Sequence, residues 1–525
     1  MVALVIDDTV RKLDRTISDL VLEYQGDFGF ETQLFLPTKE NVETLFSTIR
    51  SQQDQVARAD IDPFWTAHFN SVLRGLKMAG RTHQLYPYNY IHTVAGFLGK
   101  LMDFDINAPQ EKVKQATGKL RRLAPVLDEV IRLVKPLPPS RKQQVANSAT
   151  AITSLLARML DYFAGYQDQI EPESLQALGE QVHINQAALA AAVDAIEKMP
   201  AYTGNEEEAS LPFDQVMGEG LQVPLDFILS WYKDDFLQRK EEFYELGRTI
   251  DPRRDPFAIL QEDSPAYDNP QRLFEDARRV VNIMREYSLD YVTLPEGEVC
   301  EVGPVAEQSK MDCPTANCGG ADMWTGTLRS RMGLNEDNYT AFNRASLWDT
   351  VAHECYPGHH TNAAKGAAVD LPRTFRLYLP LVRAMVEGIA HRSETLMAPH
   401  YEDDLARLSA AHRVYYCAAR VKAEMDLNYY RRSPQELMRM YQEDLQVNEM
   451  TARLQVQAHL MYPGDAISYY TGARVLESRR RELGVEARPF TEPIFSFGFV
   501  SLDTMNKLVA MSPRDGETIK QFGSL

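Results

Sequence analysis

Cysteines, long apolar runs and excess positive charge are all scarce in this chain. Its 525 residues include five cysteines, too few for a disulfide framework in a chain of this length. No run of about 18 apolar residues occurs, so no membrane-spanning helix is predicted. Lysine and arginine number 56 against 74 aspartate and glutamate residues, a net charge of −18. This negative charge disfavours nucleic acids and anionic membranes as partners.

The first ten residues also lack the features of a secretory leader. They turn acidic at once, whereas a leader combines positive charge with an apolar run. Together with the low cysteine content, this predicts a cytoplasmic location. Hydrophobic residues make up 44% of the chain, which excludes a disordered protein and is enough for a large core.

Helical periodicity dominates the chain. Across the first 200 residues, apolar side chains recur at three- and four-residue spacing between breaks that contain proline and glycine. Residues 199–220 are typical of a surface connection and separate an N-terminal helical region, 1–200, from a second region, 215–525. One continuous structural unit is the alternative. Short β-branched segments at 290–294 and 298–302 predict a strand or two, so the expected fold is mainly α with a small β element.

Histidines crowd into one part of the chain. Seven of the eleven lie between residues 353 and 459, and the densest group is the sequence His-Glu-Cys-Tyr-Pro-Gly-His-His at 353–360. It is similar to the zinc motif H-E-x-x-H, in which both histidines bind the metal and the glutamate acts as general base. Here Pro357 stands four residues after His353. Because Pro357 and Gly358 interrupt a regular helix, we expect them to loop out and return His359, or else His360, to the metal. The alternative is an ordinary helix end.

A zinc site with two histidines needs a third protein ligand. The apolar segment 381–397 predicts a buried helix, on which Glu387, His391 and Glu394 share one face. A carboxylate on so apolar a helix needs a partner, and a metal would provide one. We therefore predict Glu387 as a ligand, with His391 and Glu394 behind it. The alternative is an ion pair of Glu387 with Arg383 or Arg392.

A third segment, residues 461–472, contains a Pro-Gly turn that leads into a helix. Asp465 falls in the first turn of this helix, where a negative charge interacts favourably with the helix dipole. Tyr469 or Tyr470 is a candidate to donate a hydrogen bond to an oxyanion, and His459 is another. The alternative is a capped helix with packed aromatic side chains.

Together the three segments resemble the large family labelled domain of unknown function 885. The matching patterns are H-E-x-x-P-G-H-H at 353–360, E-G-x-A at 387–390 with Glu394 beyond, and P-G-x-A-x-S-Y at 463–469 with Gly472. The family is mostly helical and is grouped with the zincin-like metallopeptidases. The resemblance therefore implies a zincin-like helical metallohydrolase, with residues 215–525 as its catalytic region.

The resemblance also implies roles for individual residues. His353, Glu387 and one or both of His359 and His360 would bind zinc. Glu354 would act as the base. Tyr469 would donate a hydrogen bond to the oxyanion. From their positions in the sequence, His391, Glu394, His459 and Asp465 are the candidates for a second layer around the metal or for contacts to substrate.

The chain departs from the family around these segments. Members usually carry D-x-G-x-H where residues 424–428 read Glu-Met-Asp-Leu-Asn, and Arg-Tyr where residues 458–459 read Ala-His. Glutamine usually stands at the position of Asp465. Because the metal-binding positions match while their neighbours differ, a substrate other than a common peptide is an alternative.

The leading hypothesis is a zinc-dependent hydrolase of an amide or peptide bond in a small peptide or peptide-like substrate. One alternative is a metal-dependent lyase, isomerase or hydrolase acting on a small molecule of a biosynthetic pathway. Another is a non-catalytic metal-binding protein, and a third is a cysteine hydrolase with Cys355 as nucleophile and His359 as base. Zinc is the expected cofactor, although a site of two histidines and a glutamate accepts other divalent metals. No nucleic-acid or membrane partner is expected.

Overall fold

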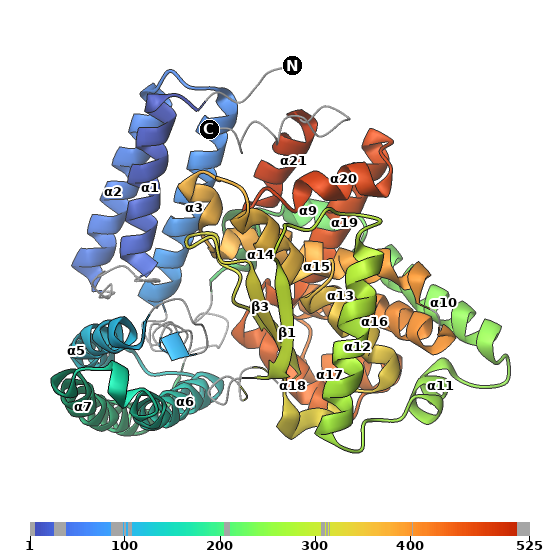
Figure 1. Ribbon diagram of the computed structural model, residues 1–525, viewed down its shortest axis with the longest axis horizontal. Coiled ribbons are helices and arrows are strands. Elements are labelled where there is room, and N and C mark those ends of the chain that lie inside the picture. The colour runs from blue at the N-terminus through green and yellow to red at the C-terminus, as the bar shows by residue number, and fades with distance from the viewer. Residues whose placement is uncertain are drawn as a thin grey trace.

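Helices make up most of the computed structural model, which describes residues 6–25, 38–85, 98, 101–102, 108–203, 211–305, 310, 313, 315–401 and 403–511. The prediction of a mainly helical fold with a small β element is confirmed (Figure 1). Among the described residues, none of the helices combines the length and the apolar character that crossing a membrane requires. The helices are α1 Asp8–Gln25, α2 Lys39–Arg58, α3 Pro63–Leu85, α5 Pro109–Leu133, α6 Pro139–Ala164, α7 Pro172–Glu197, α8 Phe213–Gln215, α9 Leu225–Leu229, α10 Tyr232–Ile250, α11 Pro256–Asp263, α12 Pro270–Ser288, α13 Arg344–Glu354, α14 His359–Ala367, α15 Arg383–Met397, α16 Asp404–Glu424, α17 Pro434–Asp444, α18 Glu449–Met461, α19 Asp465–Leu483, α20 Ala487–Ile494 and α21 Leu502–Met511.

The β element is a three-stranded sheet in the order β1-β3-β2. Strand β1 (Val299–Pro304) runs parallel to β3 (Arg329–Leu334), and β2 (Ala316–Gly319) runs antiparallel to β3. The strand predicted at 298–302 is thus confirmed, but the one predicted at 290–294 is wrong. The backbone N–H groups of residues 290–292 donate to carbonyl oxygens in the last turn of α12, so they are not available to a sheet.

The larger hydrophobic cores join helices from different parts of the chain. Helices α5, α6 and α7 enclose a core of their own and lie together in Figure 1. Helices α1, α2 and α3 instead share the largest core with α15, α19, α20 and α21. The first helices therefore pack against the part of the chain that carries the predicted site. The division into regions 1–200 and 215–525 stays a prediction, and residues 204–210 of its boundary lie outside the described residues.

Two glycines allow α15 and α19 to cross closely. A Cβ atom on Gly472 would lie 1.8 Å from the carbonyl oxygen of Ala384, and one on Gly388 would lie 2.5 Å from the backbone carbon of Gly472. Both obstacles are backbone atoms, which cannot rotate away as a side chain can. The crossing holds the start of α19, with Tyr469, against the helix that carries Glu387.

We expect Gly472→Ala to lower the free energy of unfolding by about 1–3 kcal/mol or more, because its methyl group meets the backbone of α15. Gly118→Ala in α5 is the matched control, since a Cβ there has nothing within 4 Å. It should stabilise the protein by about 0.5–1 kcal/mol through helix propensity. Urea denaturation measures both, and equal effects of the two substitutions would contradict the close crossing.

Candidate metal centre

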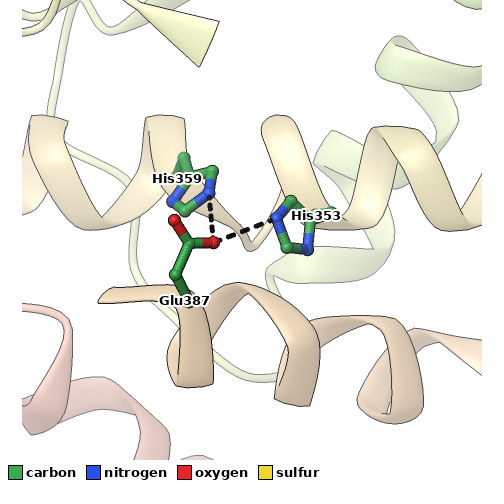
Figure 2. A group of neighbouring side chains, drawn as sticks. All are labelled: His353, His359 and Glu387. Carbon is green, nitrogen blue, oxygen red and sulfur yellow. Dashed lines mark ion pairs between the residues drawn. The ribbon is translucent and has the colours of Figure 1, made fainter. Parts of the chain in front are cut away.

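Side chains from three helices converge on one point (Figure 2). His353 stands near the end of α13, His359 begins α14, and Glu387 lies in the first half of α15. Their potential ligand atoms all lie within 4.8 Å of one another. The Nε2 atoms of His353 and His359 are each 3.5 Å from Oε2 of Glu387.

The local sequence explains how two histidines six residues apart come together. Helix α13 begins at a capping box formed by Asn343 and Ser346, and it ends at Glu354. The chain then reverses and starts α14 at His359. A Cβ atom at position 358 would lie 1.8 Å from the carbonyl oxygen of His353, so only glycine allows this reversal. The Pro-Gly interruption thus returns His359 to the last turn of α13.

His360 lies outside the candidate centre, contrary to the prediction that included it among the ligands. Its side chain is fully buried, with Nε2 2.6 Å from Oε2 of Glu298 and Nδ1 2.8 Å from Oγ of Ser330. Successive residues of a helix point about 100° apart, so His359 and His360 cannot both face α13. His360 instead joins α14 to the sheet.

Neither arginine proposed as an ion-pair partner of Glu387 takes that role. Arg383 forms an ion pair with Asp465, and Nε of Arg392 lies 3.4 Å from Oε2 of Glu477. Oε2 of Glu387 is buried and has no hydrogen-bond partner among the described residues. Burial raises the pKa of Glu387, but its interactions with His359 and His353 outweigh burial and hold the pKa well below its ordinary value. The carboxylate is therefore charged and faces two imidazoles.

This donor set fits a divalent metal ion. A tetrahedral zinc with bonds of about 2.0–2.1 Å places its ligand atoms about 3.3 Å apart. The observed spacing of 3.5 Å between Glu387 and each imidazole is close to that value. Two histidines and one glutamate are also the ligands of catalytic zinc sites, which keep a fourth position open. Such an ion would also provide a partner for the buried Oε2 atom of Glu387, which lacks a hydrogen bond among the described residues.

Glu394 connects the candidate ligand His353 to His391. Its Oε1 atom lies 2.7 Å from Nδ1 of His353, and its Oε2 atom lies 2.7 Å from Nδ1 of His391. The carboxylate is fully buried. A carboxylate on Nδ1 fixes the ring orientation of a metal-binding histidine and leaves Nε2 free for the ion. Glu394 and His391 therefore lie behind the candidate ligand His353, and their role as a second layer around a metal stays a prediction.

Tyr469 lies directly beside the centre. Its ring stacks on His353, with centroids 5.9 Å apart and an interplanar angle of 15°. The guanidinium carbon of Arg420 lies 5.0 Å from the centre of the tyrosine ring. The charge of Glu387, together with burial, raises the pKa of Tyr469 well above its ordinary value, so the phenol keeps its proton and can donate it in a hydrogen bond. Glu354, 9% exposed, follows His353 on α13.

The remaining predicted residues contact other side chains. His459 belongs to another buried cluster, with Nε2 2.7 Å from the hydroxyl of Tyr441 and Nδ1 3.4 Å from Oε2 of Glu424. These contacts do not place His459 as the oxyanion donor. Asp465 forms an ion pair with Arg383, and its charge contributes to the raised pKa of Tyr469.

The structure does not bring Cys355 into a nucleophile–base pair with His359. The Cys355 side chain is fully buried, and its sulfur lies 3.4 Å from that of Cys300 and 3.2 Å from that of Met332. Burial raises the pKa of the thiol, which disfavours the reactive thiolate. Cys355 is a core residue in this fold.

Helix α16 also forms a wall of the site, which we did not predict from the sequence. Arg413 lies 3.6 Å from Oε1 of Glu394, Cys417 interacts with His391, and Arg420 covers Tyr469. These residues are spaced i, i+4 and i+7, the spacing that singled out residues 387, 391 and 394. The same pattern, applied to arginine and cysteine, would have found them.

The bridge through Glu394 predicts a large effect on metal affinity. We expect Glu394→Gln to weaken zinc binding about 10–100-fold, because His353 loses its charged acceptor. Glu298→Gln is the matched control, since it changes an equally buried carboxylate that contacts His360. It should leave zinc affinity unchanged in a competition titration with a coloured chelator. Equal losses in both variants would contradict the assignment of His359 rather than His360.

Zinc affinity should also depend on pH. Burial disfavours the charged form of His353, but the carboxylates of Glu387 and Glu394 raise its pKa to about 10 in the metal-free protein. Below that pH a bound metal must displace a proton. We therefore expect apparent affinity to rise by up to about tenfold per pH unit from neutral pH toward 9. Chelator competition at several pH values tests this, and a flat profile would contradict it.

Comparisons with known proteins give one family and two similar solved structures. The chain matches the model of the family described as "Bacterial protein of unknown function (DUF885)" over residues 23–509. No curated protein matches it. A putative lipoprotein of unknown function from Shewanella oneidensis has a similar solved structure, with a TM-score of 0.72, 13% identity, and coverage of 96% of this chain and 99% of that chain. A putative lipoprotein from Colwellia psychrerythraea gives a TM-score of 0.68, 14% identity, and coverage of 96% and 99%. At these identities the two structures establish a shared fold alone. Because the family match extends over nearly the whole chain, this protein belongs to the family of bacterial proteins of unknown function designated DUF885.

Proposed function

We propose that this protein is a zinc-dependent hydrolase with a zincin-like catalytic region, acting on an amide or peptide bond of a small peptide or peptide-like substrate. One observation carries the proposal. His353, His359 and Glu387 converge from three helices around a buried carboxylate oxygen that lacks a hydrogen-bond partner among the described residues. His353, His359 and Glu387 would hold the metal. Bound zinc would lower the pKa of water toward neutrality and polarise a carbonyl group.

Glu354 is the proposed general base. It directly follows His353 on the last turn of α13, and only 9% of its surface is exposed. A carboxylate in this position would accept a proton from the attacking water and return it to the leaving amine. Because Glu354 would carry out both proton transfers, the reaction would not need a separate general acid.

Tyr469 is the proposed oxyanion donor. Its raised pKa keeps the hydroxyl protonated, which a donor requires. The stacking on His353 and the guanidinium of Arg420 over its ring hold the side chain in place. Glu394 supports the same geometry from behind, through its contact with Nδ1 of His353.

The cytoplasmic location stays part of the proposal. The thiols of Cys300 and Cys355 are free and lie 3.4 Å apart, an arrangement that suits a reducing compartment. The lipoprotein description of the two structural neighbours is the observation that favours the cell envelope instead. Cell fractionation with an antibody to the native chain distinguishes the two.

The proposal predicts different results for ligand and base variants. Protein purified without added metal should contain about one zinc per chain by mass spectrometry. His353→Ala and Glu387→Gln should lose the metal, whereas His183→Ala, an exposed histidine of α7, should retain it. Glu354→Gln should also retain the metal but lose hydrolysis of short peptides by about 10²–10⁴-fold.

Each alternative corresponds to a separate outcome of the same experiments. If the protein binds zinc but cleaves none of a set of short peptides and amides, this would favour a reaction on another small molecule. If the wild-type protein binds zinc but shows no activity that the Glu354→Gln substitution abolishes, it would be a non-catalytic metal-binding protein. No zinc in the wild-type protein, even after reconstitution, would overturn the proposal.

A further inference from the structure

A cavity of about 820 Å³ lies among helices α10, α15, α16 and α19, and the residues of the candidate metal centre are not among those that line it. Its volume is in the range of about 300–1,000 Å³ found for small-molecule sites. His391 and Tyr470 form part of the wall. Because Glu394 joins His391 to His353, the cavity lies two hydrogen bonds away from the candidate metal ligands.

The charge of this cavity is opposite to that of the whole chain. Six arginines and four carboxylates line it, in a protein of net charge −18. The positive potential is therefore local, and a concave wall concentrates it. The arginines are Arg239, Arg392, Arg407, Arg474, Arg480 and Arg481.

The carboxylates do not compensate these arginines evenly. Arg239 pairs with Glu242 at 2.6 Å, and Arg474 pairs with Asp235 at 2.7 Å. Glu477, in contrast, is shared. Its oxygens lie 2.6 Å from Arg480, 3.2 Å from Arg481 and 3.4 Å from Arg392. Glu486, the fourth lining carboxylate, also interacts with Arg480. Three guanidinium groups thus face two carboxylates, which leaves an excess of positive charge at this end of the cavity.

Arg392 shows the deficit most directly. It is only 4% exposed, and its Nη1 atom donates to Oγ1 of Thr491 at 3.0 Å. Its Nη2 atom is buried and has no hydrogen-bond partner in the described part of the chain. A buried N–H group without an acceptor costs free energy, so an acceptor atom supplied by a ligand of the cavity would stabilise Arg392. Burial also lowers the pKa of Arg392 to about 10, as expected for a guanidinium that is short of negative charge.

We propose that this cavity binds a small anionic molecule through carboxylate or phosphate oxygens. Arg392 is the buried anchor, and Arg480 and Arg481 provide the further positive charge. Guanidinium groups suit this task because their paired N–H donors match the geometry of both oxyanions. The side chain of Arg481 is 71% exposed, so it lies at a part of the cavity open to solvent. Neither zinc nor the proposed hydrolysis is required for this binding.

Titration calorimetry of the intact protein with inorganic phosphate, and separately with succinate, tests the proposal. Sodium chloride at matched ionic strength corrects for screening. We expect saturable binding of at least one of the two anions. We expect it to be at least about tenfold weaker in Arg392→Gln and in the double variant Arg480→Gln/Arg481→Gln, because each removes charge-assisted hydrogen bonds. Arg479→Gln is the matched control, since Arg479 belongs to the same helix but pairs with Glu482 and does not line the cavity.

Two results would overturn the proposal. One is the absence of saturable binding of both anions by the wild-type protein. The other is equal affinity in the wild-type protein and in the Arg480→Gln/Arg481→Gln variant, whose exposed substitutions decide the question if Arg392→Gln fails to fold. Glu387→Gln should bind the anion normally. Loss of binding in Glu387→Gln would place the anion at the metal centre and would also overturn the proposal.

Discussion

The charged carboxylate of Glu387, buried between two imidazoles, is the interaction on which the rest of the site depends. The side chains of His353, His359 and Glu387 come from α13, α14 and α15, so their contacts fix these three helices relative to one another. Three glycines are needed to bring these side chains together. Gly358 permits the reversal that returns His359, and the pair Gly388 and Gly472 permits the crossing that brings Tyr469 beside the carboxylate.

A chain of polar contacts extends from this point into the protein. Glu394 contacts His353 on one side and His391 on the other, and α16 supplies Arg413 beside the same carboxylate. Buried charges of this kind are tolerated only when their partners are complete. The chain also reaches the wall of the arginine-lined cavity, since His391 belongs to both. The candidate metal centre and the cavity are thus two parts of one buried polar network around α15.

Much of this arrangement follows from sequence patterns of short range. Helical periodicity predicted the mainly helical fold, and the apolar helix 381–397 predicted Glu387 beside the histidines. The features that the sequence did not predict depend on contacts between residues that are far apart in the chain. The choice of His359 over His360 depends on where α14 packs against Glu298 and the sheet, and residues 290–292 form no strand because α12 uses their N–H groups. The arginine cavity is lined by four helices, of which only α15 and α16 are neighbours in the sequence, so no local pattern predicts it.

A crystal of the protein grown with zinc, measured just above and just below the zinc absorption edge, tests the central claim most directly. We predict one strong anomalous peak that lies within bonding distance of Nε2 of His353, Nε2 of His359 and the carboxylate of Glu387, at about 2.0–2.2 Å from each. A peak bound by His360 or by the thiols of Cys300 and Cys355, or no peak between the three helices, would contradict it.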